Sequence, residues 1–430
     1  MTPAFPAAWL LFGLAFAMAA AHFLTLPWPR LATVLVYSIP VAWCLLILRN
    51  RKGALPKLNV IDTGFAAFIL VVLISATALP GPDEHGAVWK YLRFLPFMMI
   101  TPYVLGRLMS LTDLELFSRI TLFAGLALLP LLMLDRLTVV DRPWRLPIFG
   151  LDHGPLLVGG LLAALLLVLC TLVLSGGAVW LKKRGRIGRL VLLGLIAGVT
   201  FVLVWVMARG WLLAGLAGVA VVCLSMRSRS LALRAGLLAY VFAIATFALA
   251  ILPASSFHAA ILTAPAPAPA PAPAPVTALC PILGEASCQP FRDGVDSVAM
   301  RWVMYSEAVA MFVESPVWGV GAARFGECSC TGPGWYPHST ILQGFAELGL
   351  IGGGLQLGMF LLATVTLLQW LKLTSQGRID PTYAFLAGLL VLFLLSDQLY
   401  GNYLMASGTW LILGIAASLR ENAKGELSRA

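Results

Sequence analysis

Long apolar segments recur through most of the chain and limit its fold more strongly than any other feature. Twelve of them have the length of a membrane span, centred near residues 17, 40, 69, 99, 127, 168, 199, 219, 244, 361, 390 and 411. Of the 430 residues, 60% are hydrophobic and 11% are charged, whereas soluble domains have about 45–50% apolar and about 25% charged residues. Since about 20 apolar residues cross a bilayer as a helix, we expect an all-α polytopic membrane protein with about 12 transmembrane helices.

Basic residues cluster after even-numbered apolar segments: the second, sixth, eighth, tenth and twelfth. The clusters are Arg49, Arg51, Lys52 and Lys57; Lys182, Lys183, Arg184, Arg186 and Arg189; Arg227, Arg229 and Arg234; Lys372 and Arg378; and Arg420, Lys424 and Arg429. Cytoplasmic loops of membrane proteins are enriched in lysine and arginine, so this pattern predicts that both termini are cytoplasmic. The first segment lacks a basic start and a clear cleavage site, so we expect a helix there and not a removed signal peptide. The net charge of +10 reflects topology, and no nucleic-acid partner is expected.

The same topology places one long loop, residues 254–338, outside the cytoplasm. It separates helices 1–9 (residues 1–253) from helices 10–12 and a cytoplasmic tail (residues 339–430). Near its start, Ala264 to Pro275 is a run of six Ala-Pro pairs, which favours polyproline II and cannot form a packed core. We interpret this run as a spacer, and expect function in the rest of the loop.

Cysteine placement agrees with an oxidising side for this loop. Four cysteines lie in it, Cys280, Cys288, Cys328 and Cys330, while Cys44, Cys170 and Cys223 lie in apolar segments and are expected to pack there. Two disulfides are predicted, and because a bond between Cys328 and Cys330 would be strained, we favour bridges joining 280/288 to 328/330. A zinc site is the weaker alternative, since no histidine completes a usual ligand spacing.

The segment that follows the spacer predicts an amphipathic helix over residues 297–313, with Arg301 near its start. Ser315-Pro316 is expected to end this helix. Gly319, Gly321 and Gly326 then indicate an irregular passage toward His338.

His338 is the first candidate for chemistry, because its usual pKa near 6.5 suits a general base at neutral pH. Thr340 and Gln343 have the spacing of a capping box, so a helix is expected to begin beside it. The N–H groups of such a helix start would favour an anion. The alternative is that His338 only caps the helix or sits at the interface.

Arg209 is expected to end the seventh span, at a hairpin so tight that Trp211 already begins the next one. A charge this close to hydrocarbon is costly and is often functional; the alternative is a cation that complements the helix dipole or snorkels. Arg301 could pair with Glu307 or Asp296, or join Arg209 around a shared anion. Further candidates on the same side are Arg142, Arg145, His153, Lys90 and Arg93.

Arginine and histidine without paired carboxylates suit a phosphate or pyrophosphate, not a divalent metal. We therefore predict no metal and no cofactor.

Four stretches of the sequence resemble the O-antigen ligase and polymerase superfamily. "HSTILQGFAELGL" resembles its histidine signature, through His338, Ser339, Gly349 and Leu350. "RWVMYSEAVAMFVESPVWGVGAARFGE" resembles the preceding family segment, with Arg301 and Gly319-Val320-Gly321, and "MARGWLLAG" resembles a hairpin that carries Arg209. "RLPIFGLDHGPLLVGGLL" resembles the start of a family helix, with Arg145 as the possible counterpart.

The resemblance implies a GT-C-like glycosyltransferase of the bacterial inner membrane, with its active site at the periplasmic face. It implies transfer of O-antigen from undecaprenyl pyrophosphate to lipid A–core oligosaccharide, with inversion and without a metal. Arg209 and Arg301 would hold the pyrophosphate, and His338 would be the general base. From their place on the outer face, Arg142, Arg145, His153, Lys90 and Arg93 are further substrate-binding candidates, and Lys90 and Arg93 could instead contact lipid phosphates.

Three alternatives remain open at this point. An O-antigen polymerase and a protein O-oligosaccharyltransferase share the lipid-linked donor and differ in the acceptor. A 12-helix transporter belongs to another class, and would be expected to show internal repeats or charges near the bilayer midplane.

Overall fold

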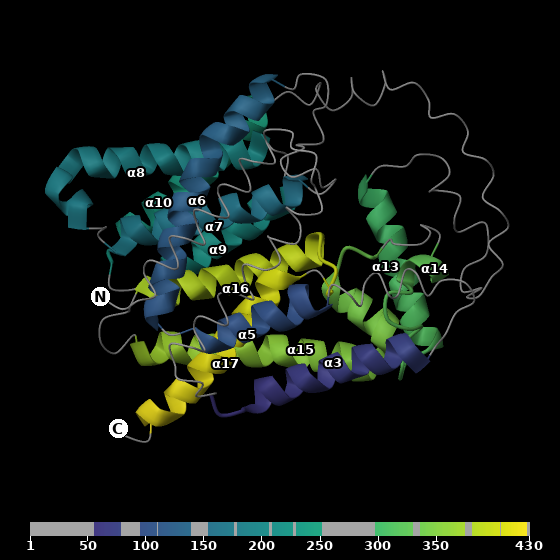
Figure 1. Cartoon of the computed structure of the whole chain (residues 1–430). Helices are drawn as coiled ribbons and strands as arrows, with labels where there is room; N and C mark the ends of the chain where they lie inside the picture. Colours follow the sequence, from purple (N-terminus) through teal and green to yellow (C-terminus); the bar gives the residue numbers. More distant parts are fainter. Residues whose placement is uncertain are drawn as a thin grey trace, which may run out of the picture.

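The computed structural model describes residues 56–78, 95–109, 111–138, 154–175, 179–205, 209–226, 229–251, 297–329, 336–374, 381–404 and 406–427. Within these ranges the chain is helical and contains no strand (Figure 1). The helices are α3 Val60–Ala78, η1 Pro96–Ile100, α5 Thr101–Leu108, α6 Leu111–Thr138, α7 Gly154–Ser175, α8 Val179–Trp205, α9 Arg209–Ser225, α10 Leu231–Ile251, α13 Ser297–Glu314, α14 Phe325–Cys328, α15 Thr340–Thr374, α16 Pro381–Leu399 and α17 Ser407–Leu427.

Every predicted span from the third onward has its centre inside one of these helices. Five stretches of the described residues are long and apolar enough to cross a membrane: Val60–Thr77, Gly185–Val204, Leu231–Ala250, Thr340–Leu371 and Pro381–Leu399. Gly159–Ser175 and Gly210–Ser225 are shorter apolar helices. The described residues therefore agree with the predicted fold class, an all-α membrane protein. The first two spans, the Ala-Pro spacer and both chain ends lie outside the described residues, so the total of 12 spans and the orientation stay predictions.

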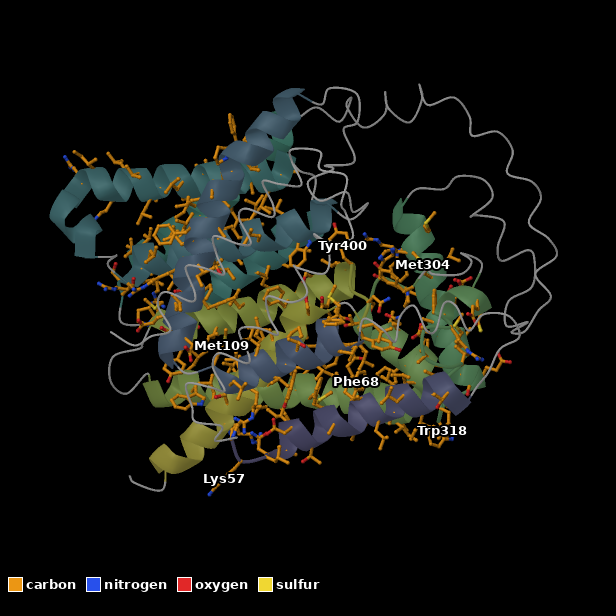
Figure 2. All side chains as sticks on the ribbon, viewed as in Figure 1. Lys57, Phe68, Met109, Met304, Trp318 and Tyr400 are labelled. Atoms are coloured by element: carbon orange, nitrogen blue, oxygen red, sulfur yellow. The ribbon has the colours of Figure 1, made fainter. Side chains whose placement is uncertain are left out.

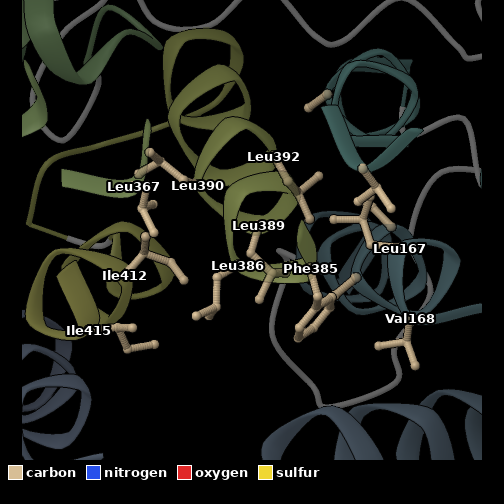
Figure 3. Packing of buried hydrophobic residues seen from close by; sticks show 14 of the residues in the cluster. Leu167, Val168, Leu367, Phe385, Leu386, Leu389, Leu390, Leu392, Ile412 and Ile415 are labelled. Atoms are coloured by element: carbon tan, nitrogen blue, oxygen red, sulfur yellow. The ribbon is translucent and has the colours of Figure 1, made fainter. Parts of the chain in front are cut away.

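A continuous apolar core joins the helices of the bundle. Figure 3 shows side chains of α16 packed between those of α7 on one side and α15 and α17 on the other; they include Leu167, Val168, Leu367, Phe385, Leu386, Leu389, Leu390, Leu392, Ile412 and Ile415. Other large apolar residues, such as Leu70, Leu361 and Leu368, are exposed on the outside of the helices. Apolar residues both inside and outside are the pattern of helices surrounded by lipid.

The helix α15 consists of two parts separated by a sharp break. Gly349 has φ 64° and ψ −161°, a backbone conformation that favours glycine. The turn after α13 pairs with this break through main-chain bonds, from Val320 N–H to Ala346 O (2.9 Å) and from Leu350 N–H to Pro316 O (2.7 Å). A Cβ at Gly319 would collide with the main chain of Glu347, and one at Gly349 with that of Val317. The two glycines are therefore needed where the main chains meet.

Candidate functional site

Arg301 reaches the site from α13, which matches the predicted amphipathic helix and ends before Ser315-Pro316 as expected. Met304, Ala308 and Met311 form the buried face of α13 and pack against Phe325, Cys328 and Ala346. This packing brings Arg301 to Tyr400, where its guanidinium carbon lies 5.0 Å from the centroid of the phenol ring. Arg301 forms no ion pair with a carboxylate among the described residues, and the suggested partner Glu307 lies fully buried.

His338 precedes α15 and has a left-handed backbone, with φ 54°. Its ring lies edge-on to Tyr336, with 4.7 Å between the ring centroids. Burial, and then the charge of Arg301, lower the pKa of His338 from 6.5 to about 4, while a hydrogen bond with the Tyr400 main chain acts in the opposite direction. The imidazole is therefore neutral at pH 7 and able to accept a proton, although it is a weaker base than the sequence predicts.

The predicted helix beside His338 exists, but the predicted capping pair is wrong. The cap is Ser339, whose Oγ accepts from the Leu342 N–H (3.3 Å). The Gln398 Oε1 accepts from the Ser339 hydroxyl (2.8 Å) and from the Ile341 N–H (3.4 Å), and Ser339 O accepts from the Gln343 N–H (2.9 Å). The N–H groups of Ile341, Leu342 and Gln343 are therefore bound within the protein and are not free to bind an anion.

Arg209 is the first residue of α9, not the last residue of the preceding helix as predicted. Its neighbour Gly210 donates its N–H to the Tyr400 hydroxyl at 2.8 Å. A Cβ at Gly210 would collide with the Tyr400 ring, so this approach requires glycine. A cation at a helix N-terminus is not stabilised by the helix dipole, so complementation of the dipole does not explain Arg209; a snorkelling cation stays the structural alternative. The structure describes the backbone of Arg209 but not its side chain.

Tyr400 is therefore the centre of the candidate site (Figure 2). Its hydroxyl accepts a hydrogen bond from the Gly210 N–H at the start of α9, and its ring lies under the guanidinium of Arg301 from α13. Its main chain forms a hydrogen bond with His338, just before α15. Three segments that were singled out separately in the sequence meet around this one residue.

A buried hydrogen-bond network around Glu347 of α15 joins this helix to the turn after α13, to α14 and to the segment after α16. Glu347 is 1% exposed, and its carboxylate accepts from Ala323 N–H (2.8 Å), Phe325 N–H (3.2 Å), Gln343 Nε2 (3.1 Å) and the Tyr403 hydroxyl (2.8 Å). Four donors satisfy a carboxylate that would otherwise be costly to bury. The network thus fixes α14 and the turn after α13, the helix that carries Arg301, to α15, which begins two residues after His338.

Most of the remaining candidate residues lie outside the part of the chain that the structure describes. Arg142, Arg145, His153, Lys90, Arg93, Cys280, Cys288 and Cys330 lie outside the described residues. Cys328 is buried against α13; its disulfide stays a prediction because its candidate partners are not described. Cys170 and Cys223 are free and buried, as expected. Among the described residues no group of three or more His, Cys, Asp or Glu side chains could hold a metal.

The sequence reasoning missed Tyr400, Gln398 and Glu347. A signal for the first two was present, because "SDQLYGNY" (residues 396–403) places several polar and aromatic residues at the end of an otherwise apolar span. Glu347 is an acid inside the apolar part of the histidine signature.

No protein-family model and no curated protein matches this sequence.

Proposed function

We propose that this protein is a membrane glycosyltransferase that moves O-antigen from undecaprenyl pyrophosphate onto lipid A–core oligosaccharide. The observation that carries the proposal is the meeting of Arg301, His338 and the start of α9 at Tyr400. Arg301 lies over an aromatic ring and forms no ion pair with a carboxylate of the described residues, so its charge is available to an incoming anion. A neutral imidazole beside it supplies a base.

In the proposed reaction, Arg301 and Arg209 bind the pyrophosphate of the donor. They stabilise the negative charge that grows on it as the bond to the anomeric carbon breaks. An acceptor sugar hydroxyl attacks that carbon from the opposite side, so the configuration inverts. His338 takes the hydroxyl proton and later releases it to water. The products are the glycosylated acceptor and undecaprenyl pyrophosphate.

Binding of the donor also has a consequence for the base. The positive charge of Arg301 is one cause of the lowered pKa of His338. A bound pyrophosphate offsets that charge, so the pKa of His338 rises when the donor is in place. The imidazole then becomes a stronger base at the moment when the reaction needs one.

The arginines also account for the proposed independence of metal ions, because they neutralise the leaving group themselves. We place the reaction at the periplasmic face of a bacterial inner membrane, with both termini cytoplasmic. The five basic clusters, all after even-numbered spans, support this orientation.

The test is a transfer assay in nanodiscs with a lipid-linked donor and lipid A–core acceptor. We expect His338→Ala to lower the rate by about 10²–10⁴-fold, and EDTA to leave the wild-type rate unchanged. Full ligation by His338→Ala refutes the base, and loss of activity in EDTA refutes metal independence. Transfer to a growing glycan or to a protein, and not to lipid A–core, would assign the polymerase or the protein O-oligosaccharyltransferase. Protein-dependent movement of the donor across the bilayer without transfer would assign a transporter.

A further inference from the structure

An exposed apolar surface lies at the α13 end of the molecule and plays no part in the proposed chemistry. It consists of Val313, Val317, Trp318, Leu350 and Ile351, which we call the apolar turn surface. The side chain of Val313 is 70% exposed, that of Leu350 60% and that of Trp318 53%. Figure 2 shows Trp318 at the edge of the molecule, at the opposite end from Lys57.

Main-chain bonds attach the turn after α13 to the beginning of the long part of α15. Leu350 N–H donates to Pro316 O at 2.7 Å, and Ile351 N–H donates to Val317 O at 3.5 Å. Gly349 lies so close to Val317 that a Cβ would collide with its main chain. The turn therefore has a fixed depth relative to α15.

That depth is set by the membrane span itself. Leu350 and Ile351 fall within the apolar stretch Thr340–Leu371. Leu350, Leu361, Val365 and Leu368 are all exposed, and their spacing of 11, 4 and 3 residues puts them on one helical face. The outward face of a span contacts lipid, so Leu350 continues a lipid-facing stripe to the end of the helix.

The composition of the turn also fits a bilayer surface. Among the exposed residues from Val309 to Trp318, Glu314 is the single charged side chain. Tryptophan is enriched at membrane–water interfaces, where its ring is in apolar surroundings and its N–H reaches polar groups. In Figure 1, α13 runs across the end of α15 and not along it, as a helix lying in the interface does.

We infer that the apolar turn surface inserts into one leaflet of the bilayer and anchors the segment that carries Arg301 at the depth of the lipid headgroups. The partner is the lipid itself, at the boundary between headgroups and acyl chains. The anchor holds the α13 segment against the membrane independently of what the site does, so this inference does not rest on the proposed function.

The test is photocrosslinking of the full chain in nanodiscs, with p-benzoylphenylalanine in place of Val317. The exposed position of Val317 accommodates the larger side chain. We expect lipid adducts on the peptide that contains position 317, identified by mass spectrometry. The same replacement at Trp370, which is 9% exposed, is the matched control and should give no lipid adduct. A crosslink between two copies of the chain, or an absence of lipid adducts at position 317, would overturn the inference.

Fluorescence provides a second measurement that does not depend on the inserted amino acid. The emission lost in Trp318→Phe should be quenched by lipids brominated near the headgroup and protected from aqueous iodide. The emission lost in Trp370→Phe should be insensitive to both quenchers. Quenching of the Trp318 component by iodide but not by the brominated lipid contradicts insertion. Neither measurement uses the glycan donor or acceptor, so failure here and failure of the proposed function are distinguishable.

Discussion

Each end of the helix bundle contains an arginine, and the two arginines differ in burial and in their partners: Arg107 is buried, whereas Arg301 is partly exposed. At the end where α3 begins, Arg107 Nε lies 3.0 Å from Asp62 Oδ1, and the Tyr103 hydroxyl donates to the same carboxylate at 2.7 Å. At the α13 end, Arg301 lies over the ring of Tyr400. The charge of Arg107 is neutralised by the Asp62 carboxylate, whereas that of Arg301 is stabilised by a cation–π contact with Tyr400 and is not neutralised by it.

A structural cation has its charge neutralised within the fold, and a functional one does not. Asp62 also caps α3 together with Asn59, since the Asn59 N–H donates to Asp62 Oδ2 (2.8 Å) and the Ile61 N–H donates to Asn59 Oδ1 (2.9 Å). Arg107 therefore belongs to a closed network that stabilises the fold. Arg301 lies near His338 and over the Tyr400 ring, and it forms no ion pair with a carboxylate of the described residues. Its loss should therefore affect chemistry more than folding.

The largest effect is expected at the closed pair. Asp62→Ala leaves the buried Arg107 guanidinium without its carboxylate and should lower the free energy of unfolding by about 3–5 kcal/mol. Denaturant titration in detergent micelles measures it. A loss below 1 kcal/mol would mean that water reaches Arg107 and that the pair is not a closed structural element.

Arg301→Gln should have the opposite effect to Asp62→Ala: a large loss of transfer rate and little loss of stability. Removing a cation that stabilises the leaving group is expected to lower the transfer rate by about 10²–10³-fold, while the free energy of unfolding stays close to that of the wild type. Arg119→Gln is the matched control, because Arg119 is exposed and its pair with Glu115 is long, at 3.8 Å. A destabilised Arg301→Gln protein with an unchanged rate per folded molecule would place Arg301 in the structural class.

The charge of Arg301 should also affect the pH dependence of the rate, through the pKa of His338. His338 must be neutral to act as a base, so activity is lost as the pH falls through its pKa. The acidic limb of kcat/KM, which reports the free enzyme, should lie near pH 4. The limb of kcat should lie at higher pH, because the bound pyrophosphate offsets the charge of Arg301. Arg301→Gln should move the kcat/KM limb upward; identical limbs in both proteins would show that Arg301 does not act on His338.

The smallest effects are expected at Tyr400. Tyr400→Phe keeps the ring under Arg301 and loses the hydrogen bond to the Gly210 N–H, at a cost of about 0.5–1.5 kcal/mol in transfer. Tyr400→Leu also loses the cation–π contact, which adds about 0.5–2 kcal/mol. Assays of the two variants side by side separate the hydroxyl from the ring. Equal rates for both would mean that the ring does not position Arg301.

The sequence predicted most of the helices because their information is local. An apolar run of span length is visible without any partner, and Ser315-Pro316 marks the end of α13 through its own backbone preference. Arg301 and His338 were recognisable as candidates because charged and titratable side chains are uncommon near apolar spans and are often functional there.

The centre of the site was not predictable in this way. Gly210 and Tyr400 are 190 residues apart in sequence, and their contact arises from the packing of α9 against α16. Capping was also mispredicted, because the Ser339 hydroxyl and the distant Gln398 side chain occupy the helix start. Thr340 instead accepts a hydrogen bond from Gln398 Nε2 at 2.9 Å. Residues distant in sequence therefore determine both the Gly210–Tyr400 contact and the cap of α15.

The most direct test of the central claim is the affinity of the purified protein in nanodiscs for undecaprenyl pyrophosphate without a sugar. If Arg301 at Tyr400 holds the pyrophosphate, Arg301→Gln should weaken binding by at least about tenfold, the equivalent of one charge-assisted hydrogen bond. Arg119→Gln should bind as the wild type does. Equal affinity of the wild type and Arg301→Gln, with both proteins folded, would contradict the account.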